Sequence, residues 1–291
     1  MNSQKIIISC DTTIALSKQE ILEKGYHVIP LNSIADGVEY HDTVDIDANK
    51  FSELMINGAK VSTSTPTIGE IEEYFDNLFK ETNADLVIHF TISSKLSSMF
   101  SLFTTVCEEK YKDKVIVVDS LSICYYIEQQ VEYATKLAAE GYDANTIIEK
   151  VKNDLIGTGE IVFVPDSLTY LKRGGRISPA VATIANLIGV LPVLNFKDGA
   201  VGKKGTTRTL SKAIISNLKE WQETIPNLDK DYELLVLATD DSCVDKVEKV
   251  VELVKEFAPS MAHKIVKISL NVTAHAGPKT IGIGIAKKIK M

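Results

Sequence analysis

The stretch from Val61 to Glu70, VSTSTPTIGE, divides an irregular polar segment from a strongly periodic one. Beyond it, apolar residues recur at the three- and four-residue spacing of an amphipathic helix: Ile71, Tyr74, Phe75, Leu78 and Phe79. Thr67 precedes Glu70 by three residues, which is the spacing of a capping box. The sequence therefore predicts a helix that begins at Thr67.

Hydroxyl side chains crowd the approach to this helix: Ser62, Thr63, Ser64, Thr65 and Thr67. Free backbone N–H groups and the positive end of the helix dipole favour an anion at such a position. Two interpretations remain open from these residues alone. The stretch is either an anion site or an ordinary capped helix start with spare polar residues.

Apolar runs that end in polar residues recur through the first half of the chain. Buried strands are predicted at 5–10, 26–31, 85–90 and 115–120, with helices following them. A strand, a helix and a further strand at this spacing form a right-handed unit with a parallel sheet. The first half is therefore predicted to be a doubly wound α/β domain. Segment 34–47, which carries many Asp, Glu and Gly residues, is predicted to be a surface loop.

A second hydroxyl-rich loop follows the strand at 85–90. It contains Ser93, Ser94, Ser97 and Ser98 and leads into a helix. In open α/β sheets, ligands bind at this carboxyl edge of the strands. The loop is therefore a second candidate for contact with a ligand.

A new pattern begins after Gly157-Thr158-Gly159, so we predict domains of residues 1–157 and 158–291. Arg173-Gly174-Gly175-Arg176 predicts a tight turn between two arginines. Ser178-Pro179 predicts the start of a buried helix that runs to Val190. Further strands are predicted at 161–165, 193–196, 234–238, 264–268 and 281–285.

His275 precedes Gly277-Pro278 near the end of the chain, and we predict that it follows a strand. A histidine held there can donate a hydrogen bond to a carboxylate. A purely structural histidine at a strand end is the alternative. The Gly-rich strand after it, with Gly282 and Gly284, predicts a place where a neighbouring group can approach the backbone closely.

The composition excludes several classes of protein. The 291 residues are 45% hydrophobic and 24% charged, as in a soluble globular protein, and the net charge of −7 argues against a nucleic-acid binder. The sequence shows neither a signal peptide nor a membrane-spanning run, and its four cysteines are widely spaced, which favours free thiols in the cytoplasm. A phosphate-binding P-loop, a serine-hydrolase elbow and a histidine pair at metal spacing are all absent from the sequence. No metal and no cofactor are expected.

Six short motifs occur in order along almost the whole chain: Asp11-Thr12-Thr13, residues 63–67, residues 93–97, Asp119-Ser120, residues 173–178 and residues 275–278. Together they resemble the DegV family of bacterial fatty-acid-binding proteins, which includes the FakB subunits of fatty acid kinase. The resemblance implies an N-terminal parallel-sheet domain and a C-terminal mixed-sheet α/β domain, with a long-chain fatty acid buried between them. It also implies a partner kinase that converts the bound acid to an acyl phosphate.

The resemblance further implies which side chains hold the carboxylate. Hydroxyls of Thr63, Ser64, Ser93 and Ser94 are expected to contact it, near His275. We add Arg176 to this ligand-binding set. Acyl chain length and saturation stay open, because the sequence departs from the family's usual residues at several positions: Thr65, Ser98, Tyr125, Tyr126 and Lys279.

Two basic islands stand out on an acidic protein: Lys172 to Arg176 and Lys203 to Arg208. Such islands can steer a protein toward an acidic partner. We therefore predict that Arg173, Lys203 and Arg208 dock the kinase, and that the chain alone is not an enzyme. The resemblance leaves transient contact with a membrane open.

A different class of function remains as the alternative. An enzyme acting on a small phosphorylated or hydroxylated metabolite could use the arginines as a phosphate clamp. Retention of a long-chain acid by the purified protein separates the two hypotheses.

Overall fold

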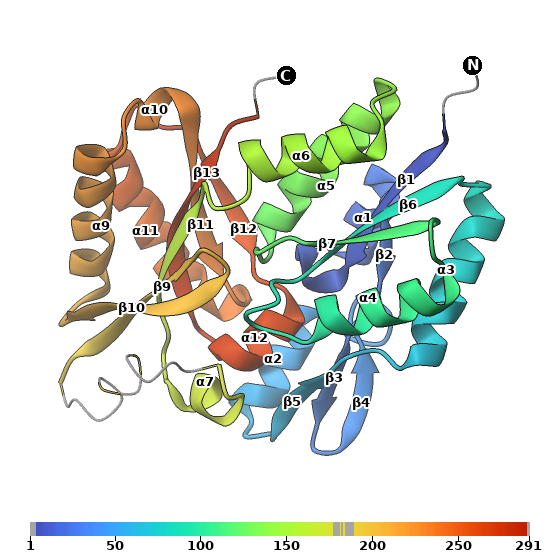
Figure 1. Cartoon of the computed structure of the whole chain (residues 1–291). Coiled ribbons are helices and arrows are strands. Elements are labelled where there is room, and N and C mark those ends of the chain that lie inside the picture. The colour runs from blue at the N-terminus through green and yellow to red at the C-terminus, as the bar shows by residue number, and fades with distance from the viewer. Residues whose placement is uncertain (1–3, 177–180, 182, 184–188, 290–291) are drawn as a thin grey trace.

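The computed structural model describes residues 4–176, 181, 183 and 189–289. It is an α/β structure with one sheet in each half of the chain and a smaller sheet beside them (Figure 1). The buried helix predicted from Ser178 to Val190 lies largely outside the described residues.

The first sheet consists of parallel strands. Their bounds are β1 Ile6–Asp11, β2 His27–Ile29, β6 Leu86–Thr91 and β7 Val115–Asp119. They pair in the order β2-β1-β6-β7. β6 is buried along its whole length, which explains why its sequence is a nearly continuous apolar run. The predicted parallel sheet of the first half is confirmed.

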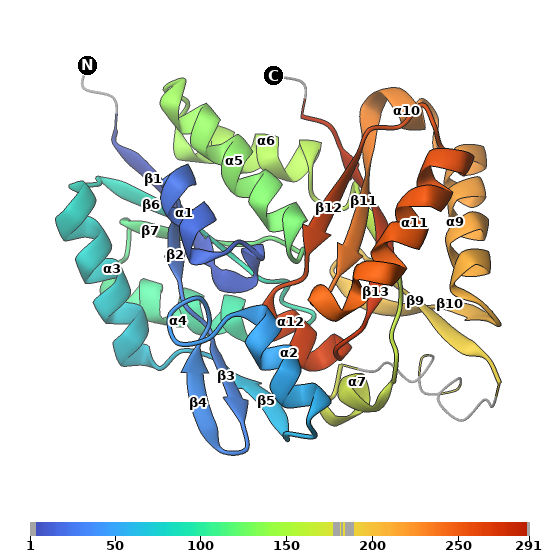
Figure 2. The same ribbon diagram turned by 180° about the vertical axis from the view of Figure 1, so that it is seen from behind.

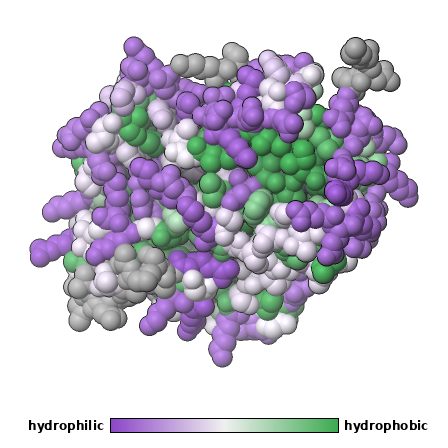
Figure 3. All heavy atoms as spheres, in the orientation of Figure 1, coloured by the Kyte–Doolittle hydropathy of each residue, from purple (hydrophilic) through white to green (hydrophobic). Residues whose placement is uncertain are grey.

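Helices cover both faces of this sheet. Those of the first half are η1 Thr12–Ile14, α1 Lys18–Lys24, α2 Ala48–Ile56, α3 Ile68–Thr82, α4 Met99–Lys110, α5 Tyr125–Ala139 and α6 Ala144–Asp154. In Figure 1, α5 and α6 lie above the sheet and α4 lies below it. Hydrophobic atoms gather in the area of α5 and β7, and hydrophilic atoms border them (Figure 3).

The start of α3 is confirmed. The Thr67 hydroxyl accepts a hydrogen bond from the Glu70 N–H at 3.2 Å, and the Glu70 carboxylate accepts one from the Thr67 N–H at 2.6 Å. This reciprocal pair satisfies two backbone donors that have no partner within the helix.

The prediction of a surface loop over 34–47 is wrong for much of that segment. Strands β3 Asn32–Ala35, β4 Val38–His41 and β5 Val61–Ser64 form a small antiparallel sheet in the order β4-β3-β5. Asp36 and Gly37 both have positive φ, 47° and 83°, as a two-residue hairpin turn requires. The polar composition that predicted a loop therefore belongs to this turn and the exposed edge strand β4.

The second sheet is mixed. Its strands are β8 Glu160–Val164, β9 Leu191–Lys197, β10 Ala200–Thr207, β11 Tyr232–Ala238, β12 His263–Lys267 and β13 Ile281–Lys287. They pair in the order β10-β9-β8-β13-β11-β12, and only the β11–β12 pair among these is parallel. The other helices with bounds in the described residues are α7 Thr169–Arg173, α9 Leu210–Thr224, α10 Leu228–Asp231, η2 Asp241–Cys243, α11 Val244–Phe257 and α12 Leu270–Ala276. In Figure 2, α9 and α11 stand together on the outer side of this sheet.

His275 lies in the last turn of α12, so the prediction that it follows a strand is wrong. Ser269 caps the helix, with its hydroxyl accepting from the Val272 N–H at 3.4 Å. The helix is seven residues long, which is too short for its apolar period to show in the sequence.

Contacts of α12 cross between the two halves of the chain. It packs on α2 and β5, and Asn271 donates to the Ser33 hydroxyl at 2.9 Å. The domain boundary at residue 157 stays a prediction. Over the described ranges, none of the helices combines the length and apolar character needed to cross a bilayer.

Candidate functional site

A cavity of about 360 Å³ lies between elements of the two halves. Small-molecule sites usually have volumes of about 300–1,000 Å³. Much of its wall is apolar, including Ile123, Ile161, Phe163, Phe196, Leu237 and Ile268. Its polar lining includes Thr63, Arg176 and His275, so the wall offers an anion-binding group beside an apolar surface.

Thr63 and His275 form the centre of the polar lining. The Thr63 hydroxyl oxygen lies 2.9 Å from Nε2 of His275. The other ring nitrogen, Nδ1, is buried and has no hydrogen-bond partner in the described part of the chain. Burial, and to a smaller extent the charge of Arg176, lowers the pKa of His275 to about 4. The imidazole is therefore neutral at pH 7, with one nitrogen able to donate and one able to accept.

Arg176 supplies the positive charge of the site. Its Nε donates to the Leu96 carbonyl at 3.0 Å, and its Nη1 donates to the Gly174 carbonyl. These bonds fix the guanidinium against the cavity wall. They use two of its five N–H donors, and a planar guanidinium is well suited to a carboxylate.

The double glycine has two different uses. Gly175 has φ +71° and makes the predicted turn. Gly174 has an ordinary φ, but a Cβ there would lie 2.2 Å from Nδ1 of His275. The end of α7 can therefore lie directly against the imidazole only because residue 174 has no side chain.

The two serines of the second loop lie elsewhere. Ser64 lines the cavity, as expected, but Ser93 and Ser94 are not among its lining residues in the described chain. The Ser93 hydroxyl donates to the Gly199 carbonyl at 2.6 Å, and the Ser94 N–H donates to Asp119 at 3.0 Å. The structure brings Ser97 and Ser98 of the same loop to the cavity instead.

Some polar residues line the cavity although the sequence did not predict that they bind a ligand: Thr13, Thr65, Asn271 and Thr280. Thr13 belongs to the Asp11-Thr12-Thr13 motif, and Thr65 belongs to the hydroxyl-rich stretch before α3. Both therefore lay in segments that the sequence had already marked as candidate sites. Asn271 and Thr280 had no such signal, because their place depends on α12 and its following loop.

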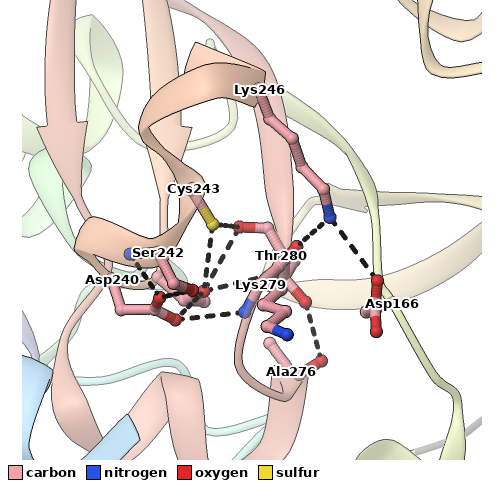
Figure 4. Close-up of polar contacts among 9 residues, drawn as sticks. Asp166, Asp240, Ser242, Cys243, Lys246, Ala276, Lys279 and Thr280 are labelled. Carbon is pink, nitrogen blue, oxygen red and sulfur yellow. Dashed lines mark hydrogen bonds and ion pairs between the residues drawn. The ribbon is translucent and has the colours of Figure 1, made fainter. Parts of the chain in front are cut away.

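That loop is held by a polar cluster (Figure 4). Asp240 accepts from the Lys279 N–H at 3.0 Å, and Lys246 donates to the Lys279 carbonyl at 2.9 Å. Lys279 has φ +61°, which is uncommon for a residue with a side chain. Thr280 donates through its hydroxyl to the Ala276 carbonyl at 3.0 Å. The cluster therefore ties the end of α12, and with it His275, to the second sheet.

The residues expected to dock a partner are exposed. Arg173 ends α7, Arg208 follows β10, and Lys203 on β10 donates to Thr183 at 3.2 Å. Arg173 also lines a smaller cavity of about 150 Å³, which shares Thr63, Arg176 and His275 with the larger one. The two cavities thus share part of their polar lining, and the smaller one is also lined by an exposed arginine.

A metal site is not seen over the described ranges, where no group of three or more His, Cys, Asp or Glu side chains is arranged to hold an ion.

A family model described as "Uncharacterised protein, DegV family" matches residues 5–288. The chain belongs to the DegV family. It is 32% identical to a DegV domain-containing protein of Staphylococcus aureus, with 98% of this chain and 99% of that protein covered.

Solved structures share the fold. One, from Bacillus subtilis, is described as a fatty acid binding protein; it is 25% identical with a TM-score of 0.83, covering 98% of this chain and 100% of that one. Another, from Eubacterium ventriosum, is described as a stearic acid-binding protein; it is 24% identical with a TM-score of 0.82, covering 98% of each chain. The expected DegV fold, with a parallel sheet and a mixed sheet, is confirmed.

Proposed function

We propose that this protein binds a long-chain fatty acid in the 360 Å³ cavity and presents its carboxylate to a partner kinase for acyl phosphate formation. The observation that carries the proposal is the division of the cavity wall. The Thr63–His275 pair and Arg176 gather in one place, and the rest of the wall offers a mainly apolar surface. A carboxylate on a long alkyl chain matches both parts.

The head group is held by neutral and charged donors together. Arg176 offsets the carboxylate charge, and Thr63 or the neutral His275 donates a hydrogen bond to it. Charge-assisted hydrogen bonds of this kind contribute about 1.5–3 kcal/mol each. Ser64 adds a further hydroxyl at the wall. The Ser93 hydroxyl and the Ser94 backbone N–H act on the acid indirectly, by fixing the loop that carries Ser97 and Ser98.

The protein is a carrier that is not catalytic alone. Phosphoryl transfer needs a nucleotide, a metal and a cradle for the moving phosphoryl group. The sequence has no P-loop, and the described residues hold no metal-ligand cluster. The partner kinase supplies these parts, and Arg173, Lys203 and Arg208 dock it through their exposed charge. The cytoplasmic location stays a prediction.

Native mass spectrometry of the purified protein, followed by lipid extraction, tests the proposal. A retained long-chain acid, lost on delipidation and regained on addition of palmitic acid, is the expected result. An empty cavity that takes up small phosphates and not palmitic acid overturns it in favour of the metabolite enzyme. ATP turnover by the single chain that a point substitution in it abolishes contradicts the carrier role.

A further inference from the structure

Asn271 lies in the cavity wall with one half of its amide group unpaired. The residue is among those that line the 360 Å³ cavity, and its exposed fraction is only 5%. Its Nδ2 donates to the Ser33 hydroxyl at 2.9 Å and to the Asn32 carbonyl at 3.3 Å. Its Oδ1 is buried and has no hydrogen-bond partner in the described part of the chain. The cavity wall therefore contains a buried acceptor that the described residues do not satisfy.

The orientation of this amide follows from its neighbours. A backbone carbonyl only accepts hydrogen bonds, so the end of the amide that faces the Asn32 carbonyl is the NH₂ group. The reverse orientation would place two acceptor oxygens against each other. Both bonds from Nδ2 run to strand β3 of the small sheet. Oδ1 is thus the end of the Asn271 amide that the small sheet does not use.

Asn271 lies beside the residues proposed to hold the carboxylate. Asn271 and His275 are one turn apart on α12, so they share a face of the helix and their Cβ atoms lie about 5–6 Å apart. Their partners are neighbours as well, because Ser33 on β3 is paired directly with Thr63 on β5. The hydrogen bonds that the two helix residues make to the small sheet therefore lie side by side. A head group held at Thr63 and His275 lies about one helical turn from Asn271.

An unsubstituted fatty acid leaves this acceptor without a partner. Its ionised carboxylate only accepts hydrogen bonds, and its methylene groups form none. A buried acceptor that lacks a donor costs free energy, which a ligand recovers if it brings the donor with it. A hydroxyl group close to the carboxylate is such a donor. It also leaves the rest of the alkyl chain free to lie against the apolar wall.

Building on the proposed function, we propose that Oδ1 of Asn271 accepts a hydrogen bond from a hydroxyl on carbon 2 or carbon 3 of the bound acid, so that the cavity prefers such hydroxy fatty acids to unsubstituted ones. The carboxylate lies at Thr63, His275 and Arg176, as proposed above. The hydroxyl is then directed along α12 toward Asn271. Asn271 determines specificity in this way and takes no part in phosphoryl transfer.

The experiment measures this preference directly. Isothermal titration of delipidated protein gives the Kd values of palmitic, 2-hydroxypalmitic, 3-hydroxypalmitic and 16-hydroxypalmitic acids. We expect the 2-hydroxy or the 3-hydroxy acid to bind about five- to tenfold more tightly than palmitic acid, because its hydroxyl pairs the buried acceptor. The 16-hydroxy acid carries its hydroxyl at the far end of the chain and should bind no more tightly than palmitic acid.

Two variants on α12 separate recognition of the hydroxyl from stability of the fold. Asn271→Leu keeps the approximate size of the side chain and removes the acceptor, so palmitic acid and the preferred hydroxy acid should bind about equally. Thr273→Val is the matched control: the Thr273 hydroxyl is also buried without a partner in the described chain, but Thr273 is not among the described residues that line the cavity. Its preference should equal that of the wild type. If Asn271→Leu does not fold, Asn271→Ala takes its place, with the same expected loss of preference.

The outcomes distinguish this inference from the proposed function. A wild-type protein that takes up none of the acids contradicts fatty-acid binding itself. A wild type that binds palmitic acid, but binds neither the 2-hydroxy nor the 3-hydroxy acid more tightly, contradicts the role of Asn271 alone. A preference that persists in Asn271→Leu or Asn271→Ala, or that Thr273→Val loses to the same extent, also overturns it. An equal gain for the 16-hydroxy acid places the recognised hydroxyl away from Asn271 and has the same consequence.

Discussion

Nε2 of His275 lies 2.9 Å from the Thr63 hydroxyl, although the two residues are 212 positions apart in the chain. Thr63 stands on the short strand β5, and His275 stands on α12. The polar part of the cavity wall therefore forms only when α12 packs on the small sheet of the first half.

Removal of the Thr63 hydroxyl should weaken fatty-acid binding. We expect Thr63→Ala to raise the Kd for palmitic acid about tenfold or more, because one charge-assisted hydrogen bond contributes about 1.5–3 kcal/mol. Ser94→Ala is the matched control, since Ser94 is exposed and does not line the cavity. Isothermal titration of delipidated protein measures both. Equal losses in the two variants, or none in Thr63→Ala, argue against the assigned head-group position.

A side chain at residue 174 should displace His275. We expect Gly174→Ala to weaken palmitic acid binding about tenfold, because its Cβ would lie 2.2 Å from the imidazole. Gly69→Ala is the control, since nothing lies within 4 Å of its Cβ position in α3 and Ala is a better helix former. It should leave binding unchanged and stabilise the fold by about 0.5–1 kcal/mol. Wild-type affinity in Gly174→Ala contradicts a positioned imidazole.

His275 should make stability depend on pH. The pKa of His275 is about 4 in the folded protein and 6.5 in the unfolded chain. As pH falls, the unfolded state therefore binds the proton first. Its contribution is present above pH 6.5 and is lost as pH falls toward 4, by up to about 3 kcal/mol before allowance for partial exposure. Denaturant unfolding of delipidated wild type and His275→Gln between pH 7 and 4 measures the difference. If the free energy of unfolding falls equally with pH in the wild type and in His275→Gln, the predicted contribution of His275 is wrong.

A bound carboxylate should reverse part of this shift. The anion favours the charged imidazolium, so the pKa of His275 rises when the acid binds. NMR titration of the imidazole protons, with and without palmitic acid, reads the change directly. An unchanged pKa places the carboxylate away from His275.

The cluster in Figure 4 should matter for binding as well as for stability. Asp240→Asn loses an acceptor for the Lys279 N–H or for Ser242, which costs about 1–3 kcal/mol, and it loosens the end of α12. We expect a lower melting temperature and faster amide exchange in residues 275–280. Asp166→Asn, at the exposed partner of Lys246, should change the stability by less than about 1 kcal/mol. Amide exchange that is unchanged near His275 contradicts the coupling.

Charge reversal at Arg208 should affect the partner and spare the ligand. In a kinase assay, Arg208→Glu should need a higher carrier concentration than the wild type to reach half-maximal rate, while its Kd for palmitic acid stays unchanged. Added salt should reduce the difference in carrier concentration between the wild type and the variant, because salt screens the charge at Arg208. Lys152→Glu, on α6, carries the same charge change away from β10 and is the control. If Arg208→Glu and Lys152→Glu raise the required carrier concentration equally, the effect comes from the net charge of the protein and not from docking at Arg208.

Local signals in the sequence were enough for much of the fold. The capping box of Thr67 and Glu70 is a contact between residues three apart, so the sequence displays it directly. Strand β6 of the first sheet is buried along its whole length, and its apolar run is equally plain in the sequence. The β3–β4 hairpin was missed because its turn residues, Asp36 and Gly37, also suit a loop.

The site was harder to predict than the fold. Thr63 contacts His275 only because α12 packs on the small sheet. No local pattern in the sequence predicts this packing. In the second loop, four serines are equally able to contact a carboxylate. The bond from Ser93 to Gly199, 106 positions later, turns that hydroxyl away and brings Ser97 and Ser98 to the wall.

The crossing of α12 into the first half also sets an order of events during synthesis. A ribosome that adds about 5–20 residues per second needs roughly 10–40 s to pass from Thr63 to His275. The first sheet can fold within that interval once β7 has been made, but Ser33 and Thr63 still lack the partners that Asn271 and His275 provide. A nascent chain thus gains its ligand-binding wall all at once, near the end of translation. Stalled chains that end before α12 should emerge with β3 and β5 uncovered and should be the forms that chaperones retain.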